Sequence, residues 1–175
     1  EAGFEDLDGL GGQVIEGSLT AGDSIDLSAV EDISIAAPQS TAGTPFSAQG
    51  VNFSNSGGAI DTGGGDLDLT FSGDITVADA LDAGAGTATL TSTAGGIAGG
   101  GTITADQVAL RADTGIGALA PLKTAVNTLA AANASAGAIL IANDKAGGSL
   151  TIGTVDGLAG LDNTHHHRRT GRLRR

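Results

Sequence analysis

The chain has 175 residues, a formal net charge of −12, 30 glycines, four phenylalanines and no Cys, Met, Trp or Tyr, so its apolar content is almost entirely aliphatic. Five of the eight basic residues lie within 168–175, which leaves residues 1–164 with three basic and 20 acidic side chains, a net charge of −17. That charge disfavours binding to nucleic acid or an anionic membrane, and no apolar run of 18 residues is present to span a bilayer.

The amino-terminal part of the chain predicts short strands separated by polar corners. Val14-Ile15 and Leu19 predict the first strand, and aliphatic residues alternate with polar ones at 25–27 and 33–35, which is typical of half-buried strands. Residues 38–47 contain two prolines and several Thr and Ser residues, and they predict a loop inserted between two repeats. The strand pattern resumes at 51–53.

One pattern occurs three times in the centre of the chain: alternating aliphatic residues, a polar interval, a glycine and a second aliphatic residue. The three copies are residues 67–75, 88–97 and 108–116. Their anchoring leucines are separated by 90 − 69 = 21 and 110 − 90 = 20 residues. Self-similarity at such a period indicates a stacked repeat architecture.

The repeat predicts which side chains stack in the core. The first column contains Leu69, Leu90 and Leu110, and the second contains Ile75, Ile97 and Ile116. Extended along the whole chain, the first column becomes the series Leu27, Phe53, Leu69, Leu90, Leu110, Leu129 and Leu150, with a mean spacing close to 20 residues. The corners are expected at Gly73, Gly95 and Gly115, where a positive φ costs little.

A repeat of about 20 residues is too short for a propeller blade, and the signature of leucine-rich repeats is absent. The pattern therefore predicts an all-β fold, a parallel β-helix (β-solenoid) whose rungs of about 20 residues stack about 4.8 Å apart.

The segment 119–134 leaves two interpretations open. Four aliphatic residues between 119 and 129 fall at helical spacing, and Pro121 suits the first turn of a helix. The alternative is a pair of strands at 122–126 and 129–131, since helix propensity is a weak guide in a stacked context. Clear strands are predicted again at 139–141 and 150–152.

Residues 102–161 carry a resemblance to a known family. The run Thr102-Ile-Thr-Ala-Asp-Gln-Val-Ala-Leu-Arg-Ala, the Gly115-Ile-Gly turn, Pro121-Leu-Lys-Thr and Leu150-Thr-Ile-Gly-Thr-Val-Asp-Gly resemble the repeat region of filamentous-haemagglutinin-like proteins, which are very long bacterial surface or secreted adhesins. The likeness extends more weakly back to about residue 60. The Asn-Pro-rich secretion motifs of that family's amino-terminal domain are absent, so the chain is similar to an interior piece.

The resemblance implies a right-handed parallel β-helix, a location outside the cell or on the bacterial surface, and neighbouring β-helix segments of the same or another chain as partners, together with a host or cell-surface ligand. We expect residues 1–164 to form a single β-helix segment of a longer repeat protein and 165–175 to form a basic, disordered tail. The expected function is a non-enzymatic structural and interaction segment of a large exported adhesin or filament. The alternative is a β-helical polysaccharide-acting enzyme or carbohydrate-binding module.

An enzyme acting on polysaccharide would need converging carboxylates, for which the candidates are Asp66, Asp68 and Asp74 beside Arg111. Such sites also use aromatic platforms, and only Phe71 is near in the sequence. An acidic substrate would be repelled by the charge of −17 on residues 1–164. We therefore assign no catalytic residue and no cofactor.

Calcium is the next candidate ligand. Asp6-Leu-Asp8-Gly9 resembles the start of a calcium loop, but its twelfth position is Gly17, where a bidentate Glu is required. Gly63-Gly-Gly-Asp66-Leu-Asp68 resembles a glycine-aspartate repeat that occurs here once. Solvated turn aspartates are the favoured interpretation, and no metal site is assigned.

Two further patterns are assigned no ligand. The threonines of the repeats would form a flat ice-binding array only if they recurred in the same outward position, but the expected columns are Asp68, Thr89, Ala109 and Thr70, Thr91, Arg111. His165-His-His167, with Arg168 and Arg169, fits a flexible tail better than a metal or nucleic-acid site.

The last rung, from 150–152 through Leu158 and Leu161, is expected to be an open sheet edge that stacks on another chain or on the next segment of its parent.

Overall fold

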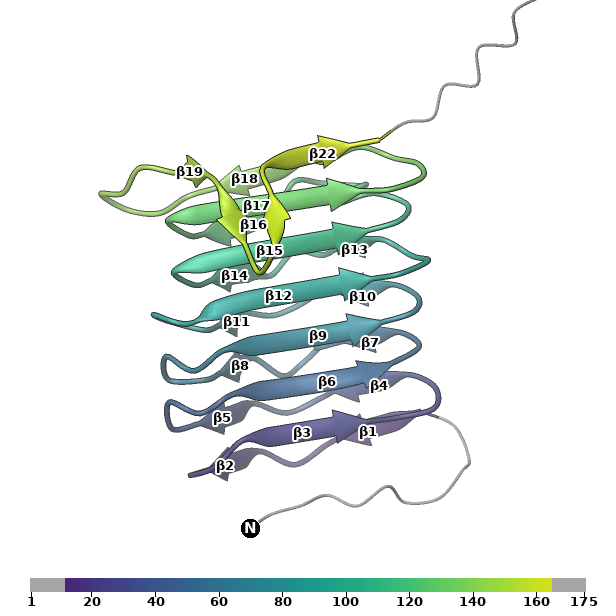
Figure 1. The fold of residues 1–175 in the computed structure, drawn as a ribbon. Coiled ribbons are helices and arrows are strands. Elements are labelled where there is room, and N and C mark those ends of the chain that lie inside the picture. The colour runs from purple at the N-terminus through teal and green to yellow at the C-terminus, as the bar shows by residue number, and fades with distance from the viewer. Residues whose placement is uncertain (1–11, 165–175) are drawn as a thin grey trace, which may run out of the picture.

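The computed structural model describes residues 12–164, which form an all-β solenoid of about seven turns with about 21 residues per turn (Figure 1). Each of the first five turns contributes one strand to each of three parallel sheets, here called A, B and C, and the chain visits the sheets in that order. Residues 12–164 contain no helix. The all-β parallel solenoid predicted from the repeat is confirmed.

The strands of each sheet follow one another up the stack. Sheet A contains β1 (Gln13–Ile15), β4 (Ile33–Ile35), β7 (Phe53–Ser54), β10 (Ile75–Thr76) and β13 (Ile97–Ala98). Sheet B contains β2 (Leu19–Ala21), β5 (Gln39–Thr41), β8 (Ile60–Asp61), β11 (Leu81–Asp82), β14 (Thr102–Thr104), β16 (Leu122–Ala125) and β18 (Ile141–Asn143). Sheet C contains β3 (Ile25–Ser28), β6 (Phe46–Gly50), β9 (Leu67–Phe71), β12 (Thr87–Ser92), β15 (Gln107–Ala112), β17 (Thr128–Asn133), β19 (Thr151–Ile152) and β22 (Leu161–Asn163).

The core lies between the three sheets and is built from columns of stacked side chains. In sheet C the register places Leu27, Ala48, Leu69, Leu90, Leu110 and Ala131 one above another, at intervals of 21, 21, 21, 20 and 21 residues. In sheet A the column is Ile33, Phe53, Ile75, Ile97, Ile116 and Ile139, where the last two residues pair as isolated bridges. Both predicted triplets, the leucines 69, 90 and 110 and the isoleucines 75, 97 and 116, are confirmed as buried columns.

The extended leucine series is confirmed at Leu27 and is wrong at Phe53, Leu129 and Leu150. Phe53 belongs to sheet A, and Leu129 stacks on Val108 in the neighbouring column of sheet C. Ala48 occupies the position that the series gave to Phe53, because a small side chain in a core column leaves little trace in a hydrophobicity pattern. Leu150 lies outside the strands and is partly exposed.

The predicted loop at 38–47 is also wrong. This segment contains β5 and begins β6, so it is an ordinary part of the second turn. Its two prolines lie just outside the strands, where a missing N–H removes no ladder hydrogen bond. The Pro45 carbonyl still accepts a hydrogen bond from the Ile25 N–H at 3.1 Å.

The ambiguous segment 119–134 forms β16 and β17, so the strand interpretation is confirmed and the helix is not formed. β16 pairs with β14 and β17 pairs with β15 in register. Leu119, which would have belonged to the apolar face of a helix, is 98% exposed in the corner that precedes β16. Stacking on the turn below outweighs the modest helix preference of an alanine-rich sequence.

The corner glycines are required for two different reasons. Gly115 has a φ of 129°, as predicted. Gly73 and Gly95 have no positive φ, but a Cβ at Gly73 would lie 2.2 Å from Asn52 Oδ1, and a Cβ at Gly95 would lie 2.5 Å from the Gly73 carbonyl carbon. At these two corners successive turns approach too closely for any side chain.

Polar side chains join successive corners through the backbone. The Asn52 N–H donates to Asp32 Oδ1 at 3.0 Å, the Asp74 N–H donates to Asn52 Oδ1 at 2.7 Å, and the Gly96 N–H donates to Asp74 Oδ1 at 2.8 Å. These three hydrogen bonds pair the N–H groups of three corners and link four consecutive turns.

Candidate functional site

The sheet C strand of the last turn is interrupted by an insertion. β19 and β22 both pair with β17, with Ile152 opposite Leu129 and Leu161 opposite Ala131. A regular turn would place one residue opposite Ala130, but this chain has the eight residues 153–160 there. The insertion leaves the ladder intact, because the Gly153 N–H donates to the Leu129 carbonyl at 3.1 Å and the Ala131 N–H donates to the Gly160 carbonyl at 2.9 Å.

The inserted residues form an antiparallel hairpin of β20 (Thr154–Val155) and β21 (Leu158–Ala159), which we call the strap hairpin. Its two-residue turn is Asp156-Gly157, with φ values of 47° and 72°. Positive φ at both central positions defines a type I′ turn, for which Asp-Gly is a favoured sequence because its twist matches that of the flanking strands. Figure 1 shows the strap hairpin lying across the front of β17 and β15.

The strap hairpin covers an apolar patch on the outer face of sheet C. The outward column of this sheet reads Asp26, Ser47, Asp68, Thr89, Ala109 and Ala130 from the first turn to the sixth. The change from polar residues to alanine occurs where the hairpin lies: Val155 packs on Ala109 and Ala130, and Leu158 packs beside them. Val155 is 2% exposed, and both alanines are fully buried although they face away from the core.

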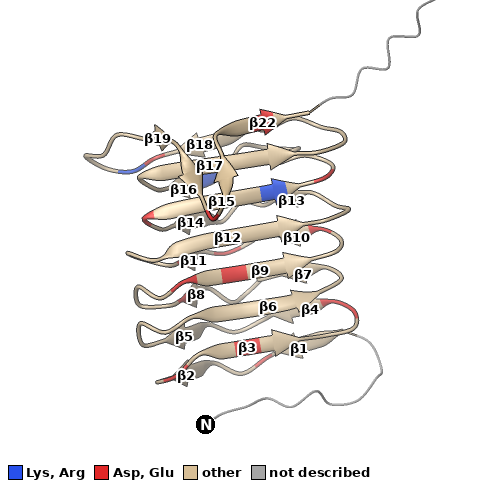
Figure 2. Cartoon of the chain, in the orientation of Figure 1, with Lys and Arg blue, Asp and Glu red and all other residues tan. Residues whose placement is uncertain are grey.

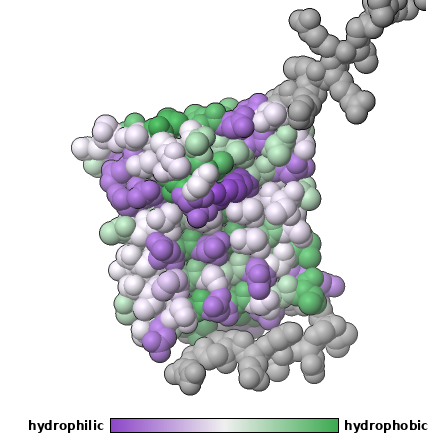
Figure 3. All heavy atoms as spheres, in the orientation of Figure 1, coloured by the Kyte–Doolittle hydropathy of each residue, from purple (hydrophilic) through white to green (hydrophobic). Residues whose placement is uncertain are grey.

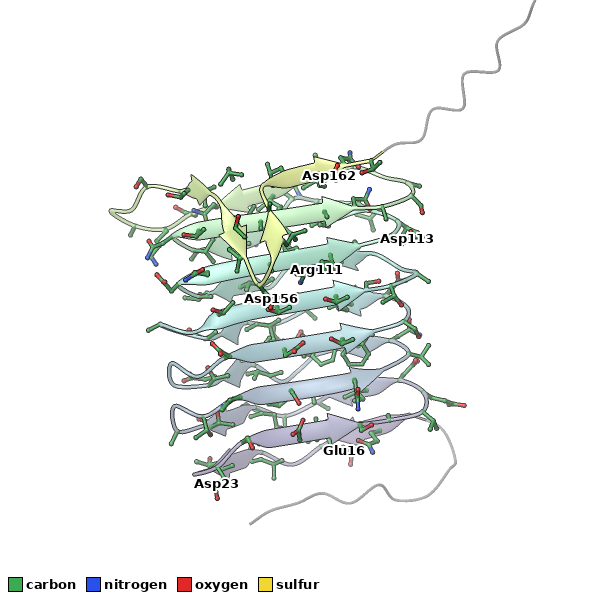
Figure 4. The ribbon with its side chains drawn as sticks, viewed as in Figure 1. Glu16, Asp23, Arg111, Asp113, Asp156 and Asp162 are labelled. Carbon is green, nitrogen blue, oxygen red and sulfur yellow. The ribbon has the colours of Figure 1, made fainter. Side chains whose placement is uncertain are left out.

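An ion pair holds the tip of the strap hairpin. Arg111 Nη1 lies 3.0 Å from Asp156 Oδ2, and Arg111 Nη2 donates to the Asp156 carbonyl oxygen (Figure 4). Arg111 lies on β15, two turns below the turn from which the hairpin emerges. A side chain of the seventh turn is thereby joined to the fifth.

Below the tip lies a shallow groove of about 290 Å³, lined by polar side chains of β9, β12 and β15 and by the hairpin turn. Its polar lining residues are Asp66, Asp68, Thr87, Thr89, Gln107 and Asp156. Asp66 accepts a hydrogen bond from the Thr87 N–H at 2.8 Å, and Asp68 accepts one from the Thr70 hydroxyl at 3.2 Å.

The four candidate residues for a polysaccharide enzyme are not brought together. Asp66 and Asp68 line the groove, whereas Asp74 lies beyond the opposite end of β9 and accepts the Gly96 N–H. Arg111 is paired with Asp156, not with any of these carboxylates. Phe71, the nearest aromatic side chain, is buried in the core against Phe53, with ring centroids 5.3 Å apart.

The calcium and threonine patterns have structural explanations. The Gly63 N–H donates to Asp61 Oδ1, and the Thr62 hydroxyl donates to the Gly65 carbonyl, so the glycine run is a corner closed by its own side chains. No group of three or more His, Cys, Asp or Glu side chains is placed to hold a metal ion within residues 12–164.

The register confirms that the outward threonine columns are broken by Ala109 and Arg111. The Asp6–Gly9 and His165–Arg169 patterns lie outside the described residues.

The last turn exposes several large aliphatic side chains. Leu140, Leu150, Ile152 and Leu161 are between 41 and 54% exposed, and Figure 3 shows apolar surface along the upper rim of the stack. Ile152 and Leu161 continue the core columns above Leu129 and Ala131. Leu158, which was expected on this edge, belongs instead to the strap hairpin.

Sequence reasoning missed the strap hairpin, which is the main departure from the repeat. The signal was present, because Asp156-Gly157 between the apolar residues Val155 and Leu158 is a strong short-range hairpin signature. The strand pattern at 150–152 hides this signal, because it predicts that the repeat continues through the segment that follows.

No protein-family model, curated protein or solved structure matches this chain. The fold defines the chain as a β-solenoid, and the resemblance to filamentous-haemagglutinin-like proteins rests on the motifs within residues 102–161. The described residues include no helix long and apolar enough to cross a bilayer.

Proposed function

We propose that this chain is a non-enzymatic structural and interaction segment of a large exported bacterial adhesin or surface filament. The observation that carries the proposal is the upper end of the stack. There the strands of sheets B and C end in β18, β19 and β22, and the core columns end in the half-exposed side chains of Ile152 and Leu161. A further turn of the same kind would pair with these strands and bury these side chains.

The polar outer surface of the lower turns supports a structural role as part of a longer stack. The outward columns of sheet C in the first four turns contain Asp, Ser, Thr and Gln, which keep a long stack hydrated. The motifs of the family resemblance fall in the fifth to seventh turns, and the regular register extends the same architecture to the first. A location outside the cell, and a host or cell-surface ligand, stay predictions of that resemblance.

The edge is tested by removing residues 165–175 and following association by light scattering at low and high salt. We expect concentration-dependent association at both salt concentrations, because aliphatic burial and strand pairing depend little on ionic strength. The matched control carries Ile152→Lys and Leu161→Lys, since lysine on an exposed edge blocks pairing. A truncated chain that stays monomeric at high concentration would contradict the stacking interaction.

The larger context is tested by reading the coding sequence on both sides of this segment. Further repeats of about 21 residues in the same frame, with an export domain, are the expected result. A coding sequence that contains an unrelated catalytic domain and no additional repeats would argue against the filament.

A further inference from the structure

We infer that the strap hairpin is a clamp that holds the seventh turn of the solenoid against the fifth and sixth. In a solenoid each turn contacts only its neighbours, so stability is a sum of nearest-neighbour terms and the end turns open first. The strap hairpin adds a contact of longer range, from Asp156 of the last turn to Arg111 two turns below.

The strap hairpin lies on the seventh turn, which has less strand pairing and less buried apolar surface than the turns below it. The seventh turn contributes a bridge at Ile139 to sheet A, the three-residue strand β18 to sheet B and the two short strands β19 and β22 to sheet C. Its other large aliphatic side chains are at most partly buried, so burial within the turn stabilises it less than burial within the lower turns does. Val155 is the exception, because it is buried against sheet C outside the core.

The sheet below is matched to the hairpin. Ala109 and Ala130 replace the polar outward residues of the lower turns, and a larger or polar side chain at either position would separate Val155 from the sheet. The hairpin also has one buried and one exposed face: Val155 and Leu158 face the sheet, and Thr154 and Ala159 are exposed. Both surfaces of the contact are therefore specified by the sequence.

The clamp is tested by hydrogen exchange on the full chain. The first variant replaces residues 153–160 by one glycine, which restores a regular strand opposite Ala130. The reporters are the amides that attach the last turn to the sixth, those of Thr151 and Thr164, which donate to the carbonyls of Asn127 and Asn133. The reference amides are those of Phe46 and Ile75, in the second and fourth turns.

We expect exchange at Thr151 and Thr164 to accelerate by about tenfold or more, because the burial of one aliphatic side chain is removed. Exchange at Phe46 and Ile75 should change less than about twofold, because they lie outside the clamped turns. Unchanged exchange at Thr151 and Thr164, or equal acceleration at all four amides, would overturn the inference.

A second pair of variants keeps the test valid if the shortened chain fails to fold. Val155→Asp places a charge under the strap hairpin, and Thr154→Asp places the same charge on the adjacent, exposed position. The clamp predicts that Val155→Asp reproduces the local acceleration and that Thr154→Asp leaves exchange within about twofold of the parent. Equal effects of the two substitutions would show that the hairpin does not act through its buried face.

Discussion

The lower part of the stack, residues 12–96, and the upper part, residues 97–164, share one repeat but differ in what their outer surface does. In the lower part the outward positions of sheet C are polar, and the charged side chains are all acidic. The upper part contains Arg111, Lys123 and Lys145, the basic residues of the described chain, and two outward alanines covered by the strap hairpin (Figure 2).

The comparison separates the roles of inward and outward residues. Inward columns continue through both parts with isoleucine, leucine, valine and alanine, and the three buried phenylalanines, Phe46, Phe53 and Phe71, all lie in the lower part. Outward residues are free to vary, and two changes to alanine convert a hydrated face into a docking face for the chain's own hairpin. Differences in function along such a stack therefore depend on outward positions and insertions.

The largest expected effect tests the core. Leu90→Ala should lower the free energy of unfolding by about 2–5 kcal/mol, because it leaves a cavity between Leu69 and Leu110 in a fully buried column. Chemical denaturation followed by far-ultraviolet circular dichroism measures it, since the chain has no Trp or Tyr. The control Leu161→Ala, on the exposed last turn, should cost less than about 1 kcal/mol. Equal losses would mean that the two regions are not distinguished by burial.

The second effect concerns a buried amide in the lower part. Asn55 is fully buried; its Oδ1 accepts from the Ala78 and Asp79 N–H groups, and its Nδ2 donates to the Asp79 carbonyl at 3.0 Å. Asn55→Ala should cost about 1–3 kcal/mol, because it leaves these backbone groups without a partner. Asn52→Ala, at the half-buried corner before β7, is the matched control and should cost less, since water can reach the groups that lose their hydrogen bonds. A smaller loss at Asn55 than at Asn52 would contradict this assignment.

The third effect tests the strap hairpin. Val155→Ala should reduce stability by about 1–2 kcal/mol, from the loss of two buried methyl-sized groups at about 0.8 kcal/mol each. The loss should appear in the unfolding of the upper part, as measured by exchange of the β17 and β22 amides under mild denaturant. A uniform loss across β6 and β9 would mean that the whole stack unfolds as one unit.

These regions also differed in how far the sequence predicted them. The core of the middle turns follows from the period of the leucines and isoleucines, because each column there places a large aliphatic residue at nearly constant spacing. The second turn does not follow from the pattern, because Ala48 occupies the leucine column there and the prolines that precede β5 and β6 favour a loop. A small core residue gives no peak in a hydrophobicity pattern, and prolines at corners favour the prediction of a loop.

The candidate site was predicted least well. The groove residues Asp66 and Asp68 and the outward Arg111 were singled out, but their partners depended on the strap hairpin. Asp156-Gly157 is a local turn signal that the sequence analysis does not use, and the side of the stack to which the hairpin folds depends on Ala109 and Ala130, more than 20 residues earlier in the chain. Tertiary packing of that kind has no local sequence signature.

The smallest expected effect is that of the ion pair at the hairpin tip. The side chains of Arg111 and Asp156 are 30 and 55% exposed, so water and salt screen their attraction, and Asp156→Asn should cost at most about 1 kcal/mol. The hydrogen bond from Arg111 to the Asp156 carbonyl is retained in this variant, which limits the loss further. Stability measured in 50 mM and 1 M salt should differ more for the parent than for Asp156→Asn, because only the parent has the pair to screen. Asp162→Asn, an exposed acidic position on β22 without a described ion pair, is the control and should leave the salt dependence of the parent unchanged. If Asp156→Asn costs more than Val155→Ala, the ion pair rather than the buried valine holds the strap hairpin, and the order of these predictions is wrong.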